Sequence, residues 1–166
     1  MSWRLILVVP LLFACLAPLA AESDLNGSSG HGPLDGLVFK GTFGPAGKPA
    51  NTVDTLRFGR GKFWSGSCVP CGFKPGNYWF RYVGTAIHFR GELISRDHGS
   101  FTYTGVVEDA SVEASIQWRK ERWYWTIDRE FRFRGDLTER AGAQAAGAAL
   151  KAAMNHNPDP ERDCRP

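Results

Sequence analysis

The chain has 166 residues, of which 43% are hydrophobic and 13% aromatic, so one domain with a packed core is expected. Its formal charge of +3 comes from Lys and Arg residues that are interspersed with Asp and Glu. The Arg-rich run at residues 129–134 alternates with Phe and Glu in the same way, which is typical of a solvated strand face. Composition therefore excludes a wholly disordered chain and argues against a nucleic-acid partner.

Residues 1–21 are expected to be an export signal. Arg4 precedes an apolar run that ends in small residues, and the run is too short and too soon interrupted for a membrane span. Its removal predicts a periplasmic or secreted protein that begins with a flexible Gly- and Ser-rich leader at residues 22–33. A second interpretation stays open, because the letters LFAC, ending at Cys15, are close to a bacterial lipoprotein signal that would leave a lipid anchor on this cysteine.

Short alternating segments follow one another from residue 34 onward. Alternation of apolar and polar residues, bounded by turn residues, predicts six strands before residue 110. They lie at residues 37–43, 52–58, 62–68, 78–83, 86–95 and 101–107. The segment CVPCGFKPGN at residues 68–77 is the longest interruption of this pattern, and loops of that kind often carry function.

The cleanest alternation, at residues 111–135, predicts a β-hairpin. Its first half has apolar residues of one parity up to Trp118, and after a polar break at Lys120 and Glu121 the alternation resumes in the other parity. The apolar residues of the second half are Trp123, Trp125, Ile127, Phe131 and Phe133. Because strand side chains alternate between faces, Trp123 and Trp125 are expected to point inward together.

These segments amount to eight short strands joined by turns, with no crossover helix between them. That arrangement predicts an all-β fold, an eight-stranded antiparallel up-and-down barrel at residues 34–137, with a two-sheet sandwich as the main alternative. Glycines inside the strands favour closure, because they permit sharp bending. The Ala-rich composition after Leu137 predicts a helix at residues 138–154 outside the barrel, followed by a Pro-broken tail that ends at residue 166.

Several motifs bear a family resemblance. They are Leu34-Asp35-Gly36, Asp54-Thr55-Leu56, Cys71-Gly72-Phe73 and Arg122-Trp123-Tyr124-Trp125-Thr126. In this combination the chain resembles small exported bacterial proteins of uncharacterised function with a lipocalin-like, or calycin-like, β-barrel. True lipocalins carry Gly-x-Trp on the first strand, whereas this chain has Gly36-Leu37-Val38 there. The resemblance therefore implies the barrel, and ligand binding inside it only by analogy of fold.

Arg129 shares the parity of Trp125, Ile127 and Phe131, which would point its guanidinium into the barrel. A buried Arg must be paired or must bind an anion. One interpretation makes it the headgroup anchor of a small apolar or amphiphilic ligand, with an aromatic wall around it. That wall would consist of Trp118, Trp123, Trp125, Phe89, Tyr103 and Phe131. In the alternatives a bulge turns Arg129 outward, or Asp54 pairs with it, and the aromatic rings simply fill the barrel.

Cys68 and Cys71 have the spacing of a redox pair, but the segment after them is rich in Gly and Pro and cannot start the helix that lowers a thiol pKa. We expect a structural Cys68–Cys71 disulfide that leaves Cys164 free. The sequence predicts neither a metal nor a cofactor, because there is no second CxxC and no His directly after Cys71.

The sequence contains no catalytic signature, so an enzyme is the least favoured class of function. Two other classes remain open. The first is a binding module that holds a small apolar or amphiphilic ligand inside the barrel. The second is an envelope interaction or structural protein whose barrel is filled and whose loops meet a partner.

Overall fold

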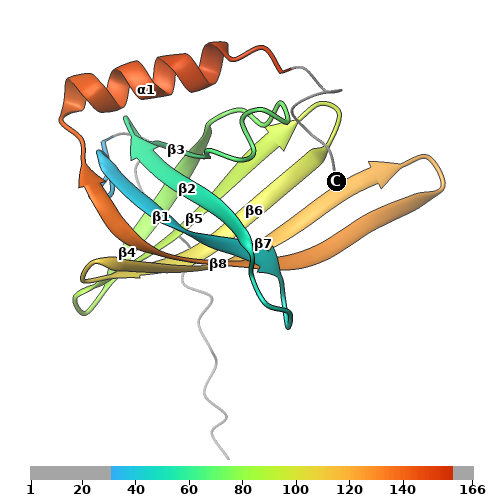
Figure 1. Ribbon diagram of the computed structural model, residues 1–166, viewed down its shortest axis with the longest axis horizontal. Coiled ribbons are helices and arrows are strands. Elements are labelled where there is room, and N and C mark those ends of the chain that lie inside the picture. Colours follow the sequence, from blue (N-terminus) through green and yellow to red (C-terminus); the bar gives the residue numbers. More distant parts are fainter. Residues whose placement is uncertain (1–30, 159–166) are drawn as a thin grey trace, which may run out of the picture.

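The computed structural model describes residues 31–158. Eight strands within this range form one closed antiparallel barrel (Figure 1). Each strand pairs with the next in sequence, and β8 closes the barrel on β1. The strands are β1 (Leu37–Pro45), β2 (Thr52–Gly59), β3 (Lys62–Ser65), β4 (Gly76–Val83), β5 (Ala86–Ser95), β6 (Gly99–Glu108), β7 (Ser111–Arg122) and β8 (Trp125–Arg140). The predicted up-and-down barrel is confirmed. The expected signal, most of the leader, Cys15 and the tail with Cys164 lie outside the described residues.

Two predicted boundaries are wrong. Strand β3 ends at Ser65 rather than at residue 68, because the backbone N–H of Gly66 turns back to donate to the carbonyl of Thr55 at 2.8 Å. Strand β8 continues to Arg140, which pairs with Leu37 of β1, so the helix cannot begin at residue 138. The barrel wall is therefore longer, and the helix shorter, than the composition suggested.

Aromatic rings fill the middle of the barrel. The ring centroids of Phe58 and Phe89 lie 5.3 Å apart, and those of Phe63 and Tyr103 lie 5.1 Å apart. All four residues are at most 1% exposed. A Cβ atom added at Gly91 would collide with the ring of Phe63, so glycine here makes room for the ring. The aromatic side chains at this level pack on one another, as the filled-barrel interpretation expects.

Helix α1 (Ala143–Asn155) lies against the outside of the barrel (Figure 1). Ala146 and Ala153 form its buried side, and Ala146 packs close to Gly59 at the end of β2. Small residues at this contact let the helix approach the wall closely, whereas the larger side chain of Met154 is 43% exposed. The ammonium of Lys74 donates to the carbonyls of Met154 and His156 at 3.2 and 2.7 Å, which satisfies the helix C-terminus. No helix within residues 31–158 is long and apolar enough to cross a membrane.

Strands β7 and β8 extend beyond the ends of the neighbouring strands β6 and β1. The last pair between β6 and β7 is Ser100 with Arg119, and the last pair between β1 and β8 is Pro45 with Phe131. Beyond these points residues 120–127 pair only with one another, and Asp128 and Arg129 pair only with Arg119 and Trp118 of β7, so residues 120–129 have no third strand beside them. In Figure 1 they project from the barrel as a two-stranded ribbon, which we call the arm.

Candidate functional site: the arm and its base

The arm ends in a two-residue turn, Trp123-Tyr124, between the last residue of β7 and the first residue of β8. The ladder reaches this turn without interruption, since Lys120 pairs with Ile127 and Arg122 with Trp125. The break predicted at Lys120 and Glu121 is therefore wrong. The apolar pattern stops after Trp118 because cations occupy the next two positions on that face, Lys120 and Arg122. It resumes in the other parity because the two-residue turn sets Arg122 opposite Trp125.

Three aromatic side chains are exposed at the end of the arm. Trp123 is 92% exposed, Tyr124 63% and Trp125 46%. The expected burial of Trp123 and Trp125 is thus wrong, although their place in a ligand site stays a prediction. Trp125 does share a face with the barrel-lining residues, but the arm has no third strand and no opposite wall to cover that face. The rings contact one another instead, with Trp123 and Tyr124 4.6 Å apart.

One face of the arm is cationic and aromatic. It continues the barrel-lining face of Trp118, because alternate ladder pairs point to the same side. The residues of this inner face are Lys120, Arg122, Trp125, Ile127 and Arg129. The guanidinium carbon of Arg122 lies 5.6 Å from the centroid of the Trp125 ring, and that of Arg129 lies 5.9 Å from the Trp118 ring. Three cations and no carboxylate stand on this face, two of them against aromatic rings.

The opposite, outer face of the arm carries Glu121, Thr126 and Asp128, with Arg119 opposite Asp128 at its base, and so has two carboxylates and one cation. Both acids have partners nearby. The guanidinium of Arg119 at the base of the arm lies 3.1 Å from Glu121, and the side-chain amide of Gln117 donates to Asp128. The arm is therefore electrically two-sided, positive toward the barrel axis and negative toward the outside.

An aromatic cluster lies at the base of the arm. Its members are Phe43, Phe73, Phe101, Trp118 and Phe131. The rings of Phe43 and Phe131 stack at 4.9 Å, and the indole N–H of Trp118 donates to the carbonyl of His98 at 2.8 Å. Phe43, Trp118 and Phe131 are only partly buried. This cluster closes the barrel interior at the end that carries the arm.

The predicted ligand residues thus fall into three groups. Trp118, Phe131 and Arg129 come together at the base of the arm. Phe89 and Tyr103 are buried in the barrel core, and Trp123 and Trp125 lie on the arm. Sequence reasoning found Arg129 but missed the other two cations of the inner face, Lys120 and Arg122, because their positions looked like a turn. It also missed Phe73, which lies in a loop without periodicity.

Asp54 is buried in a polar cluster and is not the partner of Arg129. Its carboxylate accepts hydrogen bonds from the Ser65 hydroxyl at 2.7 Å and from the Ser67 backbone N–H at 2.9 Å. The Cys68 sulfur lies 3.8 Å from the Tyr103 hydroxyl in the same cluster. Burial raises the pKa of the Cys68 thiol to about 11, so the thiolate that a nucleophile requires is absent at neutral pH. The cluster joins the β3–β4 loop to the core.

The predicted Cys68–Cys71 disulfide is wrong. Cys68 is a free thiol whose side chain is buried, 8% exposed, next to Tyr103. Cys71 is disulfide-bonded, and its partner is not Cys68. Packing of one cysteine into the core therefore separates two residues that the CxxC spacing suggested as a pair.

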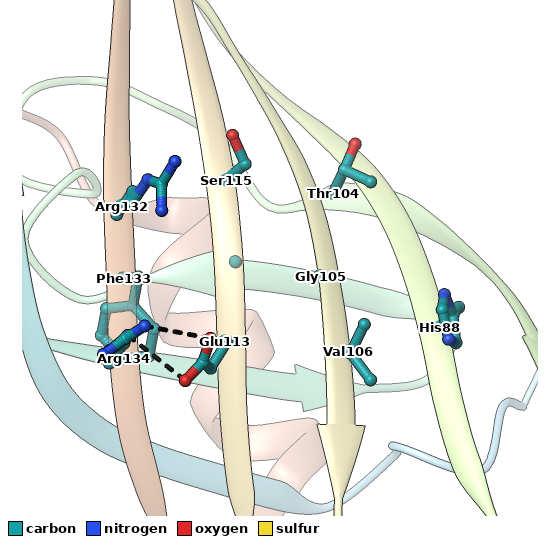
Figure 2. Close-up of a pocket in the computed structure, with 10 residues that line it drawn as sticks. His88, Thr104, Gly105, Val106, Glu113, Ser115, Arg132, Phe133 and Arg134 are labelled. Atoms are coloured by element: carbon teal, nitrogen blue, oxygen red, sulfur yellow. Dashed lines mark hydrogen bonds and ion pairs between the residues drawn. The ribbon is translucent and has the colours of Figure 1, made fainter. Parts of the chain in front are cut away.

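A concave site lies on the outer surface of strands β5 to β8 (Figure 2). This pocket of about 270 Å³ has a mixed lining, which includes the polar side chains of His88, Ser115 and Arg132 and the apolar side chains of Val106 and Ala114. The guanidinium of Arg134 is directed at Glu113, 3.2 Å away, so its charge is already compensated. Within residues 31–158, no group of three or more His, Cys, Asp or Glu side chains is placed to hold a metal ion. The arm is the stronger candidate, because its inner-face cations form no ion pair with any acid among the residues that the structure describes.

Comparison of the chain with protein-family models, curated proteins and solved structures gives no match. The barrel architecture that the lipocalin-like resemblance implied is confirmed by the strand pairing itself. Family membership and bacterial origin gain no support from these comparisons.

Proposed function

We propose that this protein is a binding module that engages its partner through the arm, with the barrel as a rigid scaffold. The observation that carries this proposal is the exposure of Trp123, 92%, at the end of a ribbon that no other strand covers. Trp, Tyr and Arg are the residues that most often dominate binding energy at interfaces, and all three types gather here. Exposing such rings has no benefit for the fold itself.

The filled interior supports an external site. Phe89 and Tyr103, two members of the expected ligand wall, are 1% and 0% exposed and pack on other rings. A ligand lying between them would have to displace core aromatics. Binding through the arm requires no such rearrangement.

A second candidate function is supported by the base of the arm. Arg129 lies over the Trp118 ring beside the half-buried Phe131, which is the chemistry that would hold a single acidic amphiphile. A fluorescent fatty acid tests it. Binding should be lost in Arg129→Gln and retained in Arg132→Gln, which removes the same charge from the opposite face of β8. Equal affinity of both variants would remove this candidate.

Site-specific photo-crosslinking in the cells that make the protein tests the main proposal. A photoreactive phenylalanine replaces Tyr124 on the arm or, as a matched control, Tyr82 on β4; both tyrosines are 63% exposed. Crosslinked products are expected from position 124 and not from position 82. No product at 124, or equal yields at both positions, would overturn binding through the arm.

We also propose that the protein is exported, on the strength of the Arg4-led apolar run. The intact mass of protein recovered from its source decides between the two forms of processing. Loss of residues 1–21 is expected, a diacylglyceryl group on an N-terminal Cys15 would establish the lipoprotein form, and an unprocessed, unlipidated chain would refute export.

A further inference from the structure

We propose that the partner of the arm is the surface of an anionic lipid bilayer, with the aromatic end among the headgroups and the inner-face cations against lipid phosphates. This inference rests on the proposed function, and it specifies the chemistry of the partner. Its basis is the order of side chains along the arm and the separation of charge between the two faces.

The aromatic end has the composition of a membrane-interface anchor. Trp and Tyr combine an apolar ring with a polar group, and they concentrate where hydrocarbon meets water. Here Trp123, Tyr124 and Trp125 are consecutive and form the turn and the first residue after it. Because Trp123 is 92% exposed, no neighbouring wall forms a pocket around its ring. A convex end of this kind suits insertion into a fluid surface better than enclosure of one small molecule.

The cations stand at the depth at which phosphates would lie. Arg122 pairs with Trp125 directly behind the turn, and Lys120 pairs with Ile127 two residues further back. At about 3.3 Å per residue, this places Lys120 roughly 7 Å behind Arg122. The polar headgroup layer on one side of a bilayer is about 5–8 Å thick. Both cations can therefore contact phosphates while the aromatic end reaches the boundary of the hydrocarbon.

The outer face fixes the orientation. The three cations Lys120, Arg122 and Arg129 of the inner face would be attracted to anionic lipids, whereas the outer face would not, because its two carboxylates outnumber Arg119. The arm should therefore tilt onto its inner face. A neutral surface would give no such preference, so the charge asymmetry favours anionic lipid over zwitterionic lipid.

The aromatic area at the end of the arm is small for the core of a stable protein interface. A large aromatic side chain buries about 150–250 Å², so three partly exposed rings contribute roughly 400 Å². A standard protein interface buries about 800 Å² on each partner. Lipid binding has no such area requirement, because partial insertion and attraction to many phosphates add together.

Vesicle binding of the full chain provides the test. Vesicles of phosphatidylcholine mixed in equal parts with phosphatidylglycerol are compared with pure phosphatidylcholine by co-sedimentation at low and high salt. We expect binding to the anionic vesicles only, weakened by salt. Trp123→Ala should weaken it roughly tenfold, and Lys120→Gln, Arg122→Gln or Arg129→Gln should each weaken it about fivefold.

Arg119→Gln is the matched control, because Arg119 lies at the base of the arm on the outer face and is paired with Glu121. It removes one positive charge, as Arg122→Gln does, yet should change affinity less than about twofold, since a paired charge on the far side contacts no phosphate. Thermal melts of all variants verify that each is folded. Equal losses for Arg119→Gln and Arg122→Gln would overturn the assignment of the inner face.

Failure of this inference can be separated from failure of the proposed function. Absence of binding to anionic vesicles at low salt, with a protein crosslinked at position 124 in cells, would overturn the lipid partner and leave the arm as the binding site. Absence of both vesicle binding and crosslinking would overturn both proposals. Equal binding to the two kinds of vesicle would overturn the role given to the cations.

Discussion

The two halves of the β7–β8 hairpin follow one alternating pattern and reach opposite outcomes. In the barrel half, Ile116 and Phe133 are 0% and 1% exposed. In the arm, Trp125 continues the same face at 46% exposure. The pairing of β7 with β8 is continuous through both halves, so local strand structure does not account for the difference.

What differs is the third strand. Within the barrel each of these strands also pairs with β6 or β1, and the closed wall places other side chains opposite the inner face. Past Arg119 and Phe131 those neighbours end. Alternation therefore specifies which residues share a face, whereas the lengths of neighbouring strands decide whether that face is buried.

The largest expected effect comes from removing a ring of the barrel half. Phe89→Ala should lower the free energy of unfolding by about 3–5 kcal/mol, because the packed neighbours Phe58 and Phe63 cannot fully close the cavity. Urea denaturation followed by circular dichroism measures the loss. A change below about 1 kcal/mol would contradict a tightly filled interior.

Alkaline pH is expected to have the second-largest effect on the stability of the barrel. The Cys68 thiol has its pKa raised to about 11 from 9.0 by burial, so above pH 9 the unfolded chain releases this proton while the folded chain retains it. The contribution of the neutral Cys68 thiol to the free energy of unfolding is therefore fully present below pH 9. It is lost between pH 9 and 11, and the loss is roughly 3 kcal/mol at most. Denaturation curves of wild type and Cys68→Ser across this range should diverge by that amount; parallel pH profiles would contradict burial of the thiol.

An intermediate effect is expected where the core has no spare room. Gly91→Ala introduces a methyl group that collides with the ring of Phe63, and overpacking of this kind costs about 1–3 kcal/mol. Combining it with Phe63→Leu should recover part of the loss, because the smaller side chain frees the space. Additive losses in the double variant, measured by urea denaturation, would show that the two side chains do not compete.

The smallest effect should come from the arm. Trp123→Ala and Trp125→Ala are each expected to change the free energy of unfolding by no more than about 0.5 kcal/mol, because neither ring is buried. Arg132→Ala, an exposed change within the barrel wall, serves as the reference. A loss above about 2 kcal/mol in either Trp variant would mean that the arm packs onto the barrel. The barrel half and the arm half of the β7–β8 hairpin would then not differ in burial.

Much of the fold was predictable from the sequence because turns and alternation are local signals. The bounds of β5 are those predicted, and the strand order follows from the absence of a crossover helix. The end of β3 at Ser65 was not predictable, because it depends on hydrogen bonds to β2. The same holds for the buried Ala146, whose contact with Gly59 joins two distant segments.

The sequence predicted which types of residue make up the candidate site better than it predicted where they lie in the fold. Parity assigned Arg129 and Trp125 to one face correctly, yet burial of that face depended on where β1 and β6 end. The inner-face cations Lys120 and Arg122 interrupted the apolar pattern and so resembled a turn. Burial of the Cys68 thiol was not predictable either, since its contact with Tyr103 joins two distant segments of the chain.

Closure of the barrel by β1 and β8 also has a consequence for folding kinetics. The Thr138 hydroxyl donates to the Val38 carbonyl across 100 residues of sequence, whereas the hairpin of β7 and β8 joins neighbouring segments. Local hairpins form within about 1–10 μs, but barrels dominated by distant contacts fold in milliseconds to seconds. The arm should thus be formed while the seam between β1 and β8 is still open, and stopped-flow fluorescence would detect that seam as the slow step. Until then the edges of both terminal strands are exposed, which makes this interval the period of greatest risk of aggregation.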